Sequence, residues 1–148
     1  MPKTKIFIGS STAAKAQARV VVRDLTFPGI KFLPWWDAFT PGRTLLEELD
    51  LIRTKVDAAI LLFSPESQTT LRKITHSIPN LNVLFEFGYF YGHFGKTKTA
   101  ILKYGDFYLP SDLGGHIYIY GGAKFKRGRA FKLLNRTKQQ FAKWIESL

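Results

Sequence analysis

The stretch Asp57-Ala-Ala-Ile-Leu-Leu-Phe63 is apolar without interruption after its first residue. An apolar run of this length, with no polar alternation, is typical of a strand that a parallel sheet buries on both faces. A polar stretch with two prolines, residues 64–80, follows it and is predicted to be a long loop. Residues 57–63 therefore predict a buried strand in an α/β sheet with helices on both sides.

Strand and helix patterns alternate outward from this run in both directions. Apolar runs predict further strands at 5–8, 30–36, 97–103 and 116–120, and helical spacing predicts helices at 13–25, 43–55, 81–94 and 129–148. Ser11 or Thr12 would cap the first helix. The core face of the last helix would consist of Phe131, Leu134, Phe141 and Ile145.

Five strands alternating with helices predict a doubly wound, flavodoxin-like parallel sheet with strand order 2-1-3-4-5. One domain would cover residues 1–148, because no linker, repeat or low-complexity segment interrupts the pattern. In such sheets ligands bind beyond the carboxyl ends of the strands, near the switch point between strands 1 and 3. The loops after the first three strands should therefore open on one shared rim.

The composition narrows the class of protein. The chain has 148 residues and no cysteine, which excludes disulfides and thiol nucleophiles and suits a reducing cytoplasm. No apolar run reaches the length of a membrane span, so we expect a cytoplasmic protein without a membrane partner. His76, His93 and His116 lack metal-ligand spacing, and the glycine fingerprint of redox NAD enzymes is missing. We therefore expect no metal and no redox cofactor.

The net charge of +11 is concentrated after Lys124. A nucleic acid, a phosphorylated ligand or an acidic protein surface would each match this charge, and so would a solvated basic face. Helix-turn-helix spacing, zinc fingers and an aromatic RNA-binding signature are all missing from the sequence. Nucleic acid is therefore not the expected partner.

With His93 taken as neutral, Glu86 carries the one charge in the apolar stretch Leu81-Asn-Val-Leu-Phe-Glu-Phe-Gly-Tyr-Phe-Tyr-Gly-His-Phe-Gly95. An ionised carboxylate on a buried helix is costly unless it is paired or opens on a cleft. Chains retain such a group mainly where it acts on a ligand. The alternative is a glutamate on the one exposed stripe of a half-buried helix, and the residues alone leave both interpretations open.

Small polar residues are predicted beside Glu86 on the rim. Gly9, Ser10 and Ser11 follow the first strand, and hydroxyls with helix-start amides suit phosphate oxygens, although such a sequence often forms only a turn and a cap. Asn82 lies at position i−4 from Glu86, on the same helix face. A carboxylate in this setting suits ribose hydroxyls or a developing positive charge.

Aromatic residues follow the second strand. Trp35, Trp36 and Phe39 could stack on a base, but adjacent tryptophans in a strand point to opposite faces, so at least one should be core. Asp37 either contacts a ligand or braces the turn at Thr40-Pro-Gly42.

Four segments together carry a family resemblance. In order they are Phe7-Ile-Gly-Ser-Ser11, the pair Trp36-Asp37 followed by Pro41-Gly42, Asn82-Val-Leu-Phe-Glu-Phe-Gly88 and Leu109-Pro-Ser-Asp-Leu-Gly114. The chain resembles, over nearly its whole length, the bacterial TIR-like domains once described as predicted nucleotide-binding proteins. In that family the domain is often fused to a cyclic-nucleotide sensor, such as a STING-like domain, in anti-phage defence.

The resemblance implies an NAD⁺ glycohydrolase, a hydrolase that cleaves the nicotinamide–ribose bond and takes NAD⁺ as substrate without a further cofactor. The family's catalytic glutamate falls on Glu86. The resemblance also implies self-association into a filament or oligomer for activity, with a fused or partner sensor domain. The segment from Trp36 to Gly42 matches the loop that TIR domains use in assembly and substrate access. One departure is Pro79-Asn80-Leu81, where the family often has Arg-Asp.

Three alternatives remain open at this stage. The first is a TIR-type module that binds a nucleotide or associates with itself without hydrolysis. The second is an enzyme similar to nucleoside deoxyribosyltransferases, which also place a glutamate at an N-glycosidic bond. The third is a nucleic-acid binder that uses the basic last helix, with an affinity that falls steeply with salt.

Overall fold

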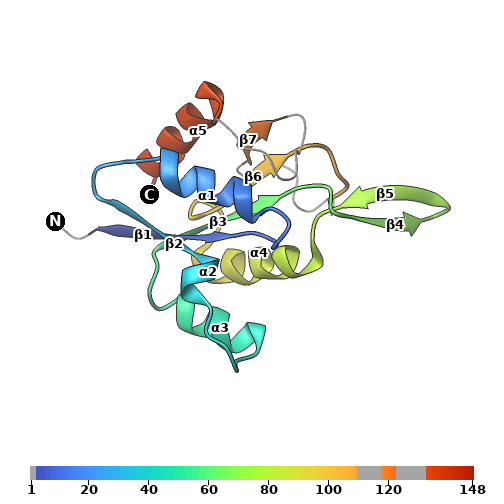
Figure 1. Ribbon diagram of the computed structural model, residues 1–148, viewed down its shortest axis with the longest axis horizontal. Helices are drawn as coiled ribbons and strands as arrows, with labels where there is room; N and C mark the ends of the chain where they lie inside the picture. The colour runs from blue at the N-terminus through green and yellow to red at the C-terminus, as the bar shows by residue number, and fades with distance from the viewer. Residues whose placement is uncertain (1–2, 110–117, 123–132) are drawn as a thin grey trace.

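The computed structural model describes residues 3–109, 118–122 and 133–148. Its main sheet contains β1 (Thr4–Gly9), β2 (Ile30–Pro34), β3 (Ala58–Phe63), β6 (Thr99–Tyr104) and β7 (Tyr118–Gly122) (Figure 1). The strand order is β2-β1-β3-β6-β7, and every neighbouring pair is parallel. Counted along this sheet alone, the order is 2-1-3-4-5, so the predicted doubly wound topology is confirmed.

Helices cover both faces of the sheet. Helices α1 (Lys15–Asp24) and α5 (Asn135–Glu146) pack on one face, and α3 (Leu45–Ile52) and α4 (Leu81–Phe94) pack on the other (Figure 1). All six residues of β3 are buried. Alternate residues of this strand belong to different cores, Ala58, Ile60 and Leu62 to one and Ala59, Leu61 and Phe63 to the other. The uninterrupted apolar sequence of β3 follows from this position between two helical layers.

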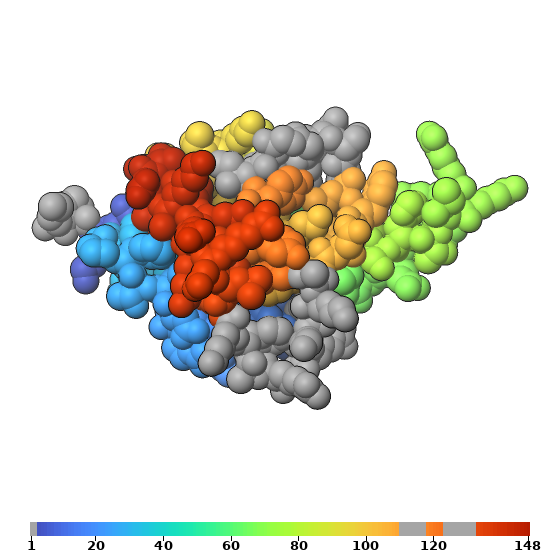
Figure 2. Space-filling model, turned by 90° about the horizontal axis from the view of Figure 1, so that it is seen from above, coloured from blue at the N-terminus to red at the C-terminus, as the bar shows by residue number. Residues whose placement is uncertain are grey.

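The prediction of a long loop at 64–80 is wrong. These residues contain a β-hairpin of β4 (Ser67–Leu71) and β5 (Ile74–Ile78), which extends beyond the carboxyl end of β3 and stands away from the body (Figures 1 and 2). Arg72 and Lys73 form its turn with φ angles of 48° and 66°. Hairpin turns of this kind usually carry asparagine or glycine, so the sequence lacked the expected turn signal.

The strand predicted at 30–36 ends earlier, at Pro34. Trp35 and Trp36 begin the short helix α2 (Trp35–Ala38) instead. Proline has no backbone N–H to extend the ladder, and β2 lies at the edge of the sheet. The two tryptophans are therefore not in a strand, but they do pack against opposite cores, Trp35 against the core under α3 and α4 and Trp36 against the core under α1. Both side chains are half-buried, and their rings meet edge to face at 5.8 Å.

The last helix also differs from its prediction. It begins at Asn135, and Phe131 lies outside the described residues. Leu134 precedes the helix and is 46% exposed, so its predicted place in the core is wrong. Phe141 is buried as predicted, and Trp144 is buried beside it. The indole Nε1 of Trp144 donates to the Thr97 carbonyl at 2.9 Å, which fixes α5 to the start of β6.

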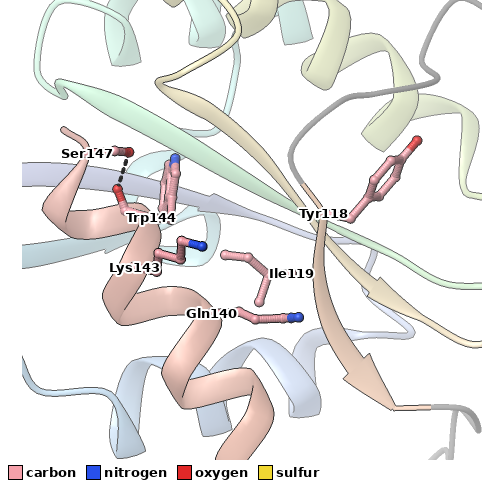
Figure 3. Close-up of a pocket in the computed structure, with 6 residues that line it drawn as sticks. All are labelled: Tyr118, Ile119, Gln140, Lys143, Trp144 and Ser147. Carbon is pink, nitrogen blue, oxygen red and sulfur yellow. Dashed lines mark hydrogen bonds between the residues drawn. The ribbon is translucent and has the colours of Figure 1, made fainter.

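Side chains of α5 also hold β7. Tyr120 N donates to Gln140 Oε1 at 2.6 Å, and Thr137 Oγ1 donates to the Tyr120 carbonyl at 2.6 Å. A hollow of about 380 Å³ lies between α5 and β7 (Figure 3). It is lined by Tyr118, Ile119, Gln140, Lys143, Trp144 and Ser147. Because Tyr118 begins β7, this hollow opens near the amino ends of the strands, away from the predicted rim.

Within the described ranges, no helix has the length and apolarity needed to cross a membrane.

Candidate active site

Glu86 lies in the second turn of α4 and is buried. The helix is capped by Asn80, whose Oδ1 accepts from Asn82 N at 2.9 Å and from Val83 N at 3.2 Å. This cap fixes the start of α4 at the carboxyl edge of the sheet. Glu86 is only 4% exposed and is followed by buried Phe87. The interpretation of Glu86 as a residue on an exposed stripe is therefore wrong.

One oxygen of the Glu86 carboxylate lacks a compensating contact within the part of the chain that the structure describes. Its Oε2 is buried and accepts no hydrogen bond, and no cation lies within ion-pair distance there. Burial away from water raises the pKa of Glu86 from its ordinary 4.5 to about 8. A buried acceptor without a donor is rare in folded proteins and indicates a position that a ligand completes.

Gly9 gives the carboxylate its place at the end of β1. A Cβ atom on Gly9 would lie 2.8 Å from Glu86 Oε2 and 2.4 Å from Leu61 Cδ1. Both distances are shorter than van der Waals contact, so no larger residue fits without movement of these side chains. The absence of a side chain at Gly9 thus lets Glu86 reach the carboxyl edge of the sheet.

The two serines after Gly9 have hydrogen-bond partners in the protein. Ser10 Oγ accepts from Trp35 Nε1 at 2.7 Å and donates to the Ser11 carbonyl at 2.9 Å. Ser11 Oγ accepts from Ala14 N at 3.1 Å, in the turn that leads into α1. Ser11 Oγ thus stabilises this turn, but the N-cap of α1 is Ala14, without a side-chain bond, so the prediction that Ser11 or Thr12 caps the helix is wrong. Ser10 holds Trp35 at the rim, and its predicted contact with a phosphate stays a prediction.

The aromatic residues after β2 form one cluster with two cations. Phe39 lies 6.0 Å from Trp35 and packs toward the core beneath it. Lys15 Nζ lies 5.5 Å from the ring centroid of Trp35 and 5.6 Å from that of Trp36. The Arg19 guanidinium lies 5.8 Å from the ring of Trp36. Neither Lys15 nor Arg19 was predicted to be a site residue, although their i, i+4 spacing places them on one face of α1.

The segment after α2 is fixed by Glu48, which was not among the predicted site residues. Glu48 is 4% exposed, and its Oε1 accepts from Thr40 N at 2.9 Å. The signal was available, because Glu48 occupies an apolar-face position between Leu45 and Ile52 of α3. Asp37 is exposed, so the bond that braces this turn comes from Glu48.

The structure thus brings part of the predicted site together. Gly9 and Glu86 are in contact, and Ser10 connects them to Trp35 and, through α2, to Trp36. Asn82 is exposed in the first turn of α4, one turn before Glu86, and Asp37 is exposed on α2. Across the described ranges, no cluster of three histidine, aspartate or glutamate side chains is arranged to hold a metal ion.

These features define a class, a doubly wound α/β domain with a buried carboxylate, Glu86, at the carboxyl edge of its sheet, whose Oε2 accepts no hydrogen bond from the described residues. Residues 5–121 match the family model of the CAP12/Pycsar effector protein TIR domain. The match covers most of the chain, so the protein belongs to this family of TIR domains. The resemblance to bacterial TIR-like domains is confirmed.

Curated relatives support the same assignment. Over 113 residues the chain is 34% identical to the CD-NTase-associated protein 12 of Sphingobacterium faecium, which covers 76% of this chain and 35% of the relative. It is also 34% identical over 113 residues to the Pycsar effector protein PaPycTIR of Pseudomonas aeruginosa, covering 74% of this chain and 37% of the relative. The chain therefore spans about a third of the length of these relatives.

The contact between Gly9 and Glu86 predicts opposite effects for two glycine-to-alanine changes. Gly9→Ala should lower the free energy of unfolding by about 1–3 kcal/mol, because the new methyl group overlaps Leu61 and Glu86. Gly88→Ala, in the interior of α4 with open space around it, should raise this free energy by about 0.5–1 kcal/mol. Urea unfolding measures both, and equal effects would contradict the close contact.

The buried carboxyl predicts a pH dependence of stability. Between pH 4.5 and 8 the unfolded chain releases the Glu86 proton while the folded chain, with its raised pKa, retains it. The free energy of unfolding should therefore fall as pH rises, by about 1.4 kcal/mol per pH unit from this group. Urea unfolding at pH 5, 6, 7 and 8 should show Glu86→Gln gaining stability relative to wild type as pH rises. Parallel profiles would show that Glu86 ionises normally.

Proposed function

We propose that this domain is an NAD⁺ glycohydrolase and the effector part of an anti-phage defence protein. The observation that carries the proposal is the buried carboxylate of Glu86 at the carboxyl edge of the sheet, whose Oε2 accepts no hydrogen bond from the described residues. Membership of the CAP12/Pycsar TIR family supports the defence role. The proposed activity requires self-association, and a cyclic-nucleotide sensor outside these 148 residues would control it.

The proposed chemistry needs only one carboxylate. In NAD⁺ the nicotinamide nitrogen is already cationic, so the bond to the ribose anomeric carbon breaks with both electrons moving to the ring. Neutral nicotinamide leaves without a general acid, and an oxocarbenium-like centre forms on the ribose. The Glu86 carboxylate stabilises this positive charge. Water then adds to the anomeric carbon and loses a proton, which gives ADP-ribose.

The raised pKa of Glu86 fits this chemistry. Without a ligand, the carboxyl group lacks a donor among the described residues, and desolvation favours its neutral form. Ribose hydroxyls would supply the missing hydrogen bonds, and the cationic nicotinamide ribose would supply a nearby positive charge. Both favour the ionised carboxylate over the neutral acid, so substrate binding itself would lower the pKa of Glu86 from about 8 toward neutral pH.

A binding module without hydrolysis is the second candidate. The same raised pKa favours it, because a carboxyl group that stays neutral in the complex can bind a ribose hydroxyl but cannot stabilise a cation. The lack of an ion-pair partner for Glu86 among the described side chains points the same way.

Nicotinamide release from NAD⁺ tests the proposal. At high protein concentration with a crowding agent, wild type should release nicotinamide, and Glu86→Gln should lose at least about 100-fold in rate, because an amide cannot stabilise the cation. Circular dichroism of the variant checks that it folds. Release by both proteins at one rate would refute the role of Glu86. Binding of ADP-ribose with no release, even in forced oligomers, would support the binding module.

The pH dependence of turnover gives a separate prediction. Because the ionised carboxylate is the active form, kcat/KM for NAD⁺ should rise about tenfold per pH unit below the pKa of about 8 in the free enzyme. It should level off above that pH. Initial rates between pH 6 and 9 measure the profile, and a flat profile would contradict a neutral Glu86 in the unliganded domain.

A further inference from the structure

Two cations of α1 have an unusual environment. Lys15 lies over both tryptophan rings and is half-buried, and Arg19 lies over Trp36 one turn later. Within the described segments, neither forms an ion pair with a carboxylate, whereas Arg23 of the same helix pairs with Asp24 at 2.6 Å. Lys15 and Arg19 are therefore held by aromatic faces and keep their hydrogen-bond donors for another partner.

The tryptophans form a fixed support. Trp35 donates its indole N–H to Ser10 Oγ at 2.7 Å and packs against the core under α3 and α4. Trp36 packs against the core under α1. The pair therefore bridges the two cores at the carboxyl end of β2. A cation placed on such a support loses little freedom when it binds an anion.

This cation–tryptophan cluster adjoins the carboxylate site. Gly9 is in contact with Glu86 Oε2, and the next residue, Ser10, holds Trp35. The cluster and the carboxylate thus lie on either side of two consecutive residues at the end of β1. Lys15 and Arg19 are cationic, whereas Glu86 is neutral without a ligand and becomes anionic where a ligand supplies hydrogen bonds and positive charge, so the two groups would receive different ends of one ligand.

We infer that Lys15 and Arg19, on their tryptophan support, bind the diphosphate of the dinucleotide whose ribose hydroxyls contact Glu86. This inference rests on the proposed function and adds a subsite to it. The diphosphate is joined to the 5′ carbon of the nicotinamide ribose, so a ribose anchored at Glu86 carries its negative charges away from that carboxylate. An ammonium and a guanidinium without acidic partners are the groups that phosphate oxygens prefer.

Ligand binding without turnover tests the inference. In a Glu86→Gln background, ADP-ribose is titrated while tryptophan fluorescence is followed. Trp35 and Trp36 report on the cluster, and buried Trp144 contributes a constant background. Lys15→Met keeps the aliphatic contact and removes the charge, whereas Lys15→Arg keeps the charge. Lys55→Met, an exposed lysine before the amino end of β3, is the matched control.

The expected change in Kd differs between the two ligands and between the variants. Lys15→Met should raise the Kd for ADP-ribose about tenfold or more, and Arg19→Met should act in the same direction. Lys15→Arg and Lys55→Met should bind like the parent. Nicotinamide riboside, which has no phosphate, should bind all variants equally, and thermal midpoints should fall only by the small amount expected from the lost cation–π contact.

Three outcomes would overturn the subsite. They are an unchanged Kd in Lys15→Met, an equal loss for both ligands, and no ADP-ribose binding to the parent. The proposed function fails in a different way. If ADP-ribose binds with the predicted dependence on Lys15 while wild type releases no nicotinamide, the anion subsite stands and the hydrolase does not. In an active wild type, Lys15→Met should raise KM for NAD⁺ and leave kcat unchanged.

Discussion

The close approach of Glu86 to Gly9 is the constraint on which the site depends. The Glu86 carboxyl group fits within the hydrophobic layer because Gly9 beside it carries no side chain, and its Oε2 accepts no hydrogen bond from the described residues. Burial of apolar side chains around this group offsets the free-energy cost of its desolvation. In this core β3 is buried on both faces, and α4 packs Val83, Phe87 and Phe90 against the sheet. A site of this kind therefore needs a complete fold around it before it can bind anything.

The doubly wound topology explains why the functional groups meet. Each parallel strand delivers its following loop to the same edge of the sheet, and β1 lies between β2 and β3 at the switch point. Gly9 ends β1, Trp35 follows β2, and the chain after β3 returns to that edge through Asn80. Opposite faces of the sheet then contribute different chemistry, with cations on α1 and the carboxylate on α4.

Much of this was predictable because it depends on local pattern. The apolar run of β3, the alternation of elements and the lone acid of α4 gave the sheet order and the location of Glu86. The hairpin at 67–78 escaped prediction because Arg72 and Lys73 adopt positive φ angles that sequence rules reserve for other residues. The tryptophans were misplaced because Pro34 ends the ladder at an edge strand, where no partner strand compels the chain to continue.

By itself, the sequence determined the fold class, the strand order and the family, since these follow from periodicity and from motifs that neighbouring residues form. Only the tertiary structure decided that Glu86 is buried without a donor, that Ser10 holds Trp35, and that Glu48 fixes the turn at Thr40. It also decided that Lys15 and Arg19 lie on two tryptophans. These are contacts between residues far apart in the chain, and their energies depend on burial and distance, which no local pattern encodes.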